Sequence, residues 1–215
     1  KHLLEYDDVI NRHREVIYGK RKKLLEAYAK QKKGETVDGE SLREMVMKMV
    51  EEEMEQVISF HTNSEDQGEW NLKEITEVVA TIFPLGPDEK QKLLSFNKPS
   101  NEKMEMVEAR EQIALFLMSL AKKKYEDLLV RQVNNAEVMI EIEKQILLKS
   151  IDNLWVDHLV AIDYLRTGIG LRGYGQRDPL VEYKRETYRM FNELLNLIQK
   201  EVVYTIYKMN IGIQL

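Results

Sequence analysis

The spacing of apolar residues near the start of the chain constrains the fold more than any other feature of the sequence. Large apolar side chains recur every seven positions, at Leu3, Ile10, Ile17 and Leu24. This spacing places them in one stripe along a helix. The pattern continues to about Lys33, just before Gly34. It therefore predicts a single helix about 50 Å long, at about 1.5 Å per residue, which needs an equally long partner to cover its stripe.

Two further long runs of helical spacing occupy the last third of the chain. The first begins near Asn135, with apolar residues at Met139, Ile142, Ile146, Ile151, Leu154, Trp155, Leu159, Ile162 and Leu165. The second follows Asp178 and Pro179, which are typical of an N-cap and a first helical position. Its apolar residues are Tyr183, Phe191, Leu194, Leu195, Ile198, Val202, Ile206 and Met209. We expect these helices to pack with the first.

The middle of the chain predicts several shorter helices. Capping-box pairs at Ser41 with Glu44 and at Asn71 with Glu74 mark two helix starts, and Pro84 ends the second of these helices. Their Met-bearing faces are typical of core filler. No segment alternates with period two, so the predicted fold class is all-α. We expect a discontinuous domain formed by 1–35 and 134–215, with 36–133 inserted as a small helical bundle.

Composition excludes several kinds of site. The chain has no cysteine, which rules out disulfides and thiolate chemistry and favours a reducing compartment. Its formal net charge is −5, so the chain as a whole does not favour polyanions. No apolar run approaches the roughly 20 residues of a membrane span, and no signal-peptide pattern opens the sequence. The uncapped helical start at Lys1 indicates an intracellular fragment of a longer protein.

The stretch from Gly168 to Pro179 is the least ordinary part of the sequence. It predicts a connection of about a dozen residues, where helical hairpins usually have about two to five. It contains four of the ten glycines, together with Arg172 and Arg177. Tyr174 stands between Gly173 and Gly175. Two interpretations remain open: a long turn with its tyrosine folded back onto the helices, or an exposed tip that contacts another chain.

Catalytic and cofactor motifs are absent from the sequence. Glycines 168, 170 and 173 formally match a dinucleotide fingerprint, but a helix precedes them where that fingerprint requires a strand. No phosphate-binding P-loop occurs, so the chain is not expected to hydrolyse ATP, and no cofactor is expected in it. The four histidines lack metal-ligand spacing. We expect His158 to be a hydrogen-bonded core or interface residue and Trp155 to be an anchor between helices. The carboxylates Asp152, Asp157 and Asp163 suggest no acid–base cleft.

Two stretches carry a family resemblance. Residues 150–166 and the following GIGLRGYGQRDPLVEYKRE resemble the two-helix finger of SecA, the bacterial preprotein translocase motor. The opening KHLLEYDDVINRHREVIY resembles the lower part of that family's long scaffold helix. Residues 36–133 match the family's helical wing domain by position and helical character. The resemblance implies a helical scaffold domain, 1–35 and 134–215, with its finger at about 136–209.

The resemblance also implies a function. The fragment is expected to be a non-catalytic part of a motor whose two RecA-like domains bind ATP and Mg²⁺. Its expected partners are the SecYEG channel, unfolded preprotein and the motor's own nucleotide-binding domains, in the cytoplasm and peripheral to the inner membrane through the channel. The family's tip tyrosine, here Tyr174, contacts the translocating polypeptide. Arg172, Gly173, Gly175 and Arg177 are the accompanying candidates for channel or substrate contact.

Two other classes of function were weighed. A standalone helical adaptor that binds a protein partner through its apolar seams would explain the absence of a catalytic site, but not the uncapped start. RNA binding by the Arg-Gly-Tyr loop is disfavoured, because Asp163, Asp178, Glu182 and Glu186 offset the nearby basic residues. No nucleic-acid partner is therefore expected.

Overall fold

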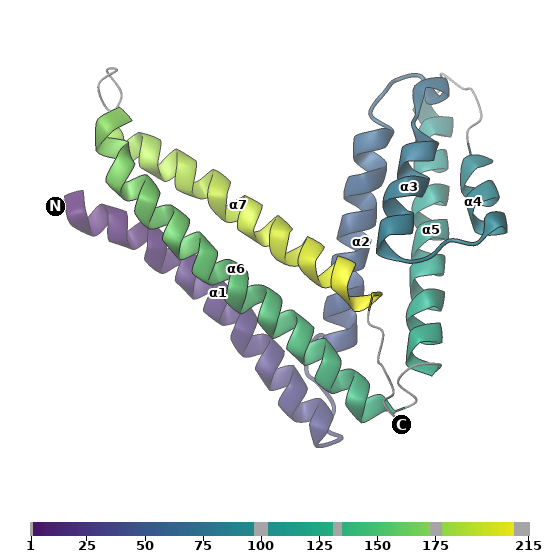
Figure 1. The fold of residues 1–215 in the computed structure, drawn as a ribbon, viewed down its shortest axis with the longest axis horizontal. Coiled ribbons are helices and arrows are strands. Elements are labelled where there is room, and N and C mark those ends of the chain that lie inside the picture. Colours follow the sequence, from purple (N-terminus) through teal and green to yellow (C-terminus); the bar gives the residue numbers. More distant parts are fainter. Residues whose placement is uncertain (1, 97–102, 131–134, 173–177, 209–215) are drawn as a thin grey trace. The chain divides into compact units, whose positions relative to one another are not determined.

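The computed structural model describes residues 2–96, 103–130, 135–172 and 178–208. These ranges contain seven α-helices and one short 3₁₀ helix, and no strand. The predicted all-α fold class is confirmed. The helices are α1 His2–Lys32, α2 Leu42–His61, α3 Leu72–Ile82, α4 Pro87–Leu94, α5 Lys103–Leu128, α6 Ala136–Arg172 and α7 Pro179–Ile206, with the 3₁₀ helix η1 at Gln67–Glu69 (Figure 1).

Backbone contacts divide the chain into two compact units. The first comprises Lys1–Leu42 and Glu141–Glu201, and the second comprises Arg43–Ile140 and Val202–Leu215. The end of the chain from Val202 thus groups with the second unit, whereas the sequence analysis assigned it to the scaffold. The expected domain limits near 35 and 134 stay a prediction. Among the described helices, none has both the length and the apolar composition that crossing a membrane requires.

In the first unit, α1 and α6 lie side by side and run in opposite directions. Four pairs of side chains join them, and the residue number falls along α6 as it rises along α1. In order along α1, they are Asp7 with Arg166, His13 with His158, Arg21 with Asp152 and Tyr28 with Glu141. The 37-residue α6 is therefore the long partner that the 31-residue α1 requires.

The apolar stripes of the long helices form the core of the first unit. Ile17 and Leu24 of α1 are only 1% and 2% exposed. Ile151, Trp155 and Ile162 of α6 and Leu194 and Ile198 of α7 are buried as well. Full burial of one such side chain stabilises a fold by about 1.5–3 kcal/mol. The stripes predicted from the sequence thus supply the main attraction between the helices.

Side-chain caps fix where several helices begin. Asp178 Oδ1 accepts a hydrogen bond from the Leu180 amide at 2.8 Å, at the start of α7. Asn71 Oδ1 accepts from the Glu74 amide at 3.0 Å, at the start of α3. Each bond satisfies an amide that has no partner within its helix. The predicted starts of α3 and α7 are confirmed.

The second unit contains the short helices and a buried aromatic cluster. Tyr207 Oη donates to the Ala121 carbonyl at 3.1 Å, and the Tyr207 ring lies 5.0 Å from that of Phe83. Arg110 of α5 donates to the Thr62 carbonyl at the end of α2 and stacks over the Trp70 ring, 4.9 Å from its centroid. These contacts give the second unit a core of its own.

The expected loop from Gly168 to Pro179 is wrong in its first part. Helix α6 continues through Gly168 and Gly170 and ends at Arg172, so the connection to α7 comprises residues 173–178. The reason is the side chain of Ile169, which is 5% exposed and belongs to a buried cluster with Ile162 and Tyr183. Seven residues separate Ile162 from Ile169, so the apolar stripe holds the last turns of α6 in spite of their glycines.

Replacing Gly168 by alanine tests this extension of α6. A Cβ at position 168 would meet no atom within 4 Å. Alanine in a helix is more favourable than glycine by about 0.5–1 kcal/mol, so Gly168→Ala is expected to raise the free energy of unfolding by about that amount in urea titrations. Gly19→Ala in the middle of α1, which is equally unobstructed, supplies the reference gain. A loss of stability for Gly168→Ala alone would show that α6 ends earlier.

Candidate functional site

The predicted tip residues fall almost entirely outside the described part of the chain. Gly173, Tyr174, Gly175 and Arg177 lie in the undescribed stretch 173–177, and Arg172 is the last helical residue, whose side chain is not described. What the structure does describe is the pair of helices that carries these residues. The geometry of the candidate site is therefore that of the two helices, α6 and α7, between which the predicted tip residues lie in the sequence.

The base of the tip is an ordered hairpin of α6 and α7. Ile169 on α6 and Tyr183 on α7 belong to one buried cluster, which ties the last turns of α6 to the first turns of α7. The Tyr183 ring lies 4.6 Å from the ring of Tyr6 on α1. The two ends of the 173–178 connection are thus held by helices that also contact α1.

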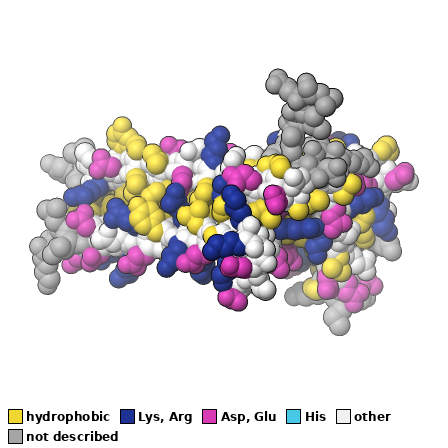
Figure 2. Space-filling view, turned by 90° about the horizontal axis from the view of Figure 1, so that it is seen from below, with side chains coloured by type: hydrophobic (Ala, Val, Ile, Leu, Met, Phe, Trp, Pro, Cys, Tyr) yellow, Lys and Arg dark blue, Asp and Glu magenta, His cyan; other side chains and the backbone are white. Residues whose placement is uncertain are grey.

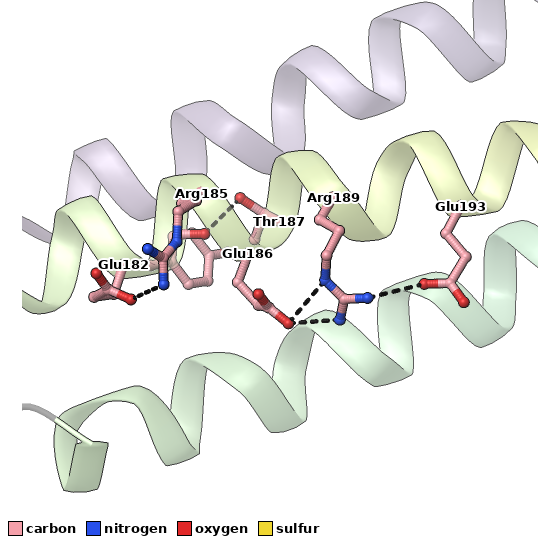
Figure 3. A network of polar contacts seen from close by, with 7 residues as sticks. Glu182, Arg185, Glu186, Thr187, Arg189 and Glu193 are labelled. Atoms are coloured by element: carbon pink, nitrogen blue, oxygen red, sulfur yellow. Dashed lines mark hydrogen bonds and ion pairs between the residues drawn. The ribbon is translucent and has the colours of Figure 1, made fainter. Parts of the chain in front are cut away.

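The outward face of α7 carries a chain of paired charges (Figure 3). Arg185 donates to Glu182 at 2.5 Å, and Arg189 donates to Glu186 at 2.6 Å while also facing Glu193 at 3.6 Å. Exposed pairs at these spacings add little to stability, because solvent screens them. On the face seen in Figure 2, basic and acidic side chains are likewise interspersed. Pairing with carboxylates lowers the positive potential that a phosphate backbone would require.

A buried pair of histidines joins α1 to α6 near the middle of the first unit. His13 Nδ1 and His158 Nε2 lie 3.2 Å apart, although the two residues are separated by 145 positions. Their side chains are shielded by aromatic rings. Phe191 of α7 stacks on His13 with 4.1 Å between ring centroids, and Trp155 stacks on His158 at 5.6 Å. His158 is thus a hydrogen-bonded core residue, and Trp155 contacts neighbours between helices, as the sequence predicts.

Burial favours the neutral form of both histidines. It lowers the pKa of His158 to about 4, with the nearby His13 as the second cause. It also lowers the pKa of His13. One ring nitrogen can then donate the single hydrogen of the contact while the other accepts it. Two histidines do not suffice for a typical zinc site, and no group of three or more potential metal ligands occurs among the described residues.

The carboxylates noted in the sequence have separate environments. Asp152 forms an ion pair with Arg21 at 2.9 Å, which is a contact between α6 and α1. Asp163 lines an open pocket with Tyr183 and Arg166. Asp157 is exposed. Sequence reasoning missed the histidine pair and the pocket, because both combine residues from distant parts of the chain.

The histidine pair predicts a pH-dependent stability. Because folding lowers the pKa of His158 from about 6.5 to about 4, its contribution is complete above pH 6.5 and is lost as the pH falls toward 4. The free energy of unfolding is expected to drop by about 2 kcal/mol more between pH 7 and pH 5 than in His158→Gln. Urea titrations at both pH values provide the comparison. Equal pH dependence in the two proteins would contradict a buried, neutral His158.

Comparison with known proteins identifies the family. The model of the SecA wing and scaffold domain matches residues 1–210. The protein translocase subunit SecA of Dehalococcoides mccartyi is 36% identical over 214 residues, which is 100% of this chain and 20% of that protein.

Further relatives agree. SecA of Caldicellulosiruptor saccharolyticus is 34% identical over 212 residues, covering 98% of this chain and 22% of that protein. SecA 1 of Clostridioides difficile is 34% identical over 211 residues, covering 98% of this chain and 20% of that protein. The chain thus spans about a fifth of the length of these curated relatives. It belongs to the SecA family and corresponds to the family's wing and scaffold domain.

Proposed function

We propose that this chain is a non-catalytic mechanical and regulatory part of an ATP-driven translocase that moves unfolded preproteins through the SecYEG channel. The observation that carries the proposal is the family match over residues 1–210, on a chain whose α6–α7 hairpin is fixed along α1. The relatives are about five times longer than this chain, which favours a part of a larger motor over a standalone helical adaptor. ATP and Mg²⁺ would then be held by nucleotide-binding domains of the whole protein.

The hairpin is suited to transmit displacement. Its two helices share a buried cluster with α1, and α6 is also joined to α1 by ion pairs and hydrogen bonds along most of its length. Close-packed side chains have low compressibility. A displacement of α1 would therefore move the hairpin with it, because the packed helices resist movement relative to one another.

Tyr174 is the proposed contact at the end of the hairpin. Only residues 173–178 separate α6 from α7, and an extended chain spans at most about 3.6 Å per residue. Tyr174 lies two residues beyond Arg172 in the sequence, and the family resemblance supports it as the tip contact. Its ring would give sequence-tolerant contact to a passing polypeptide, while Arg172 and Arg177 would contact the channel or the substrate and Gly173 and Gly175 would let the tip conform.

The proposal includes a cellular setting. The whole protein would be cytoplasmic and would reach the inner membrane peripherally, through the channel. The scaffold helix α1 and the hairpin would contact the motor's own nucleotide-binding domains, so that the hairpin's position regulates ATP hydrolysis. The chain itself would perform no chemical step.

Removal of the Tyr174 ring tests the tip. In the full-length protein with its channel, Tyr174→Ala is expected to slow translocation of an unfolded preprotein at least severalfold, because the tip loses its main contact. Translocation is measured as protease-protected preprotein over time. Tyr188→Ala removes an equally large ring, 69% exposed on α7, and is expected to have little effect. An unchanged rate for Tyr174→Ala would refute the proposed tip contact.

A further inference from the structure

The hydroxyl group of Tyr183 is buried and has no partner. Tyr183 is 0% exposed, and its Oη is a buried side-chain oxygen that makes no hydrogen bond with the described residues. The ring itself is firmly placed, by the cluster with Ile162 and Ile169 and by the ring of Tyr6. Buried hydroxyls are nearly always hydrogen-bonded. The exception calls for a group that the described residues do not supply.

Tyr183 is one of the residues that line an open pocket of about 420 Å³. The other lining residues belong to α1 and α6. Its polar lining residues are Asp7, Asn11, Arg14, Asp163 and Arg166. The charges that act on the Tyr183 hydroxyl are those of Arg166, Asp7 and Asp163. All three line the same pocket as Tyr183, whose hydroxyl lacks a partner among the described residues.

The hydrogen-bonding groups of the pocket are unevenly satisfied. Arg166 donates to Asp7 at 3.2 Å, and Arg14 donates to the side-chain oxygen of Asn11 at 2.8 Å. The carboxylate of Asp163, in contrast, has no hydrogen bond or ion pair with the described residues. Two oxygen-bearing groups of the pocket residues therefore lack a hydrogen bond with the described residues, the carboxylate of Asp163 and the hydroxyl of Tyr183. Both can accept hydrogen bonds.

We propose that this pocket binds the guanidinium group of an arginine side chain presented by a polypeptide. A guanidinium has five N–H donors in a planar fork, so it can reach Asp163 and Tyr183 together. An anion would meet the carboxylate of Asp163, which has no ion pair among the described residues, and it would have to compete with Asp7 and Asn11 for the two arginines. The site lies on the side of the hairpin, and it goes beyond the proposed contact at the tip.

The Asp7–Arg166 pair forms a movable rim. The two side chains are 52% and 44% exposed, and exposed ion pairs are weakly held. Contact with the buried Tyr183 hydroxyl requires the pocket lining to move, and release of Asp7 by Arg166 offers a second carboxylate to the incoming cation. Binding would therefore exchange one arginine for another at Asp7 and add the contacts to Asp163 and Tyr183.

Titration with argininamide tests the site, because this molecule carries the guanidinium without a carboxylate. Added to the isotope-labelled 215-residue chain, it is expected to produce saturable NMR shifts at Asp163, Tyr183 and Asp7 in the millimolar range. Citrullinamide, which has a similar shape and the same α-ammonium group but a neutral urea in place of the guanidinium, is expected to bind at least tenfold more weakly. Equal shifts with citrullinamide, or no saturation with argininamide, would overturn the proposal.

Variants locate the binding on the two open oxygens. Asp163→Asn and Tyr183→Phe are each expected to weaken argininamide binding about fivefold or more, and Tyr183→Phe keeps the buried ring. Asp157→Asn, an exposed carboxylate six positions away on α6, serves as the matched control and is expected to leave the affinity unchanged. A similar loss for Asp157→Asn would indicate nonspecific attraction to acidic residues and overturn the proposal.

The source of the arginine follows from the same titration on the full-length protein. If an arginine elsewhere in that protein fills the pocket, argininamide will shift these signals in the 215-residue chain but not in the longer one. If the arginine belongs to a bound polypeptide, both proteins will respond, and an arginine-bearing unfolded peptide will compete. Argininamide binding and translocation are independent readouts. The translocation assay tests the tip contact at Tyr174, and the titration tests the pocket whatever the translocation assay shows.

Discussion

The antiparallel contact of α1 with α6 is the interaction on which the rest of the first unit depends. A helix of 31 residues with a continuous apolar stripe cannot bury that stripe against short neighbours. The sequence supplies its partner more than 100 residues later, in a helix of 37 residues. Isolated helices are marginal in water, so both become stable through this shared burial. Helix α7 then adds Tyr183, Leu194 and Ile198 to the same core.

Polar contacts give this seam its register. Apolar stripes attract one another without strong preference for one alignment, since the hydrophobic effect is not directional. Arg21 with Asp152 and His13 with His158 each satisfy their groups in one alignment. Sliding α6 by one turn would leave two buried imidazoles without a partner, which costs free energy. Register matters for the proposed function, because it sets how far the hairpin end extends beyond α1.

The sequence predicted the features that arise from local spacing, and it missed those that need distant residues. Seven-residue spacing and the residues Asn71 and Asp178 predicted helices and their starts. Gly168 and Gly170 predicted a loop, because glycine has a low helix propensity. The packing of Ile169 in a buried cluster with Tyr183 outweighs that propensity, and a local pattern does not show it. The His13–His158 pair and the pocket lined by Tyr183 bring α1 together with helices more than 100 residues away in the sequence. No local sequence pattern predicts such a contact. The tip residues 173–177 remain a prediction from the resemblance.

The proposed transmission of displacement requires α1, α6 and α7 of the first unit to behave as one stiff body. Amide hydrogen exchange of the 215-residue chain, resolved by residue, tests this directly, since it reports the free energy of opening for each segment. We expect buried amides from Leu159 to Ile169 on α6 to exchange with nearly the same opening free energy as those around Ile17 and Leu24 on α1. If the segment from Leu159 to Ile169 opened several kcal/mol more easily than α1, the hairpin would be loosely attached and could not transmit displacement as proposed.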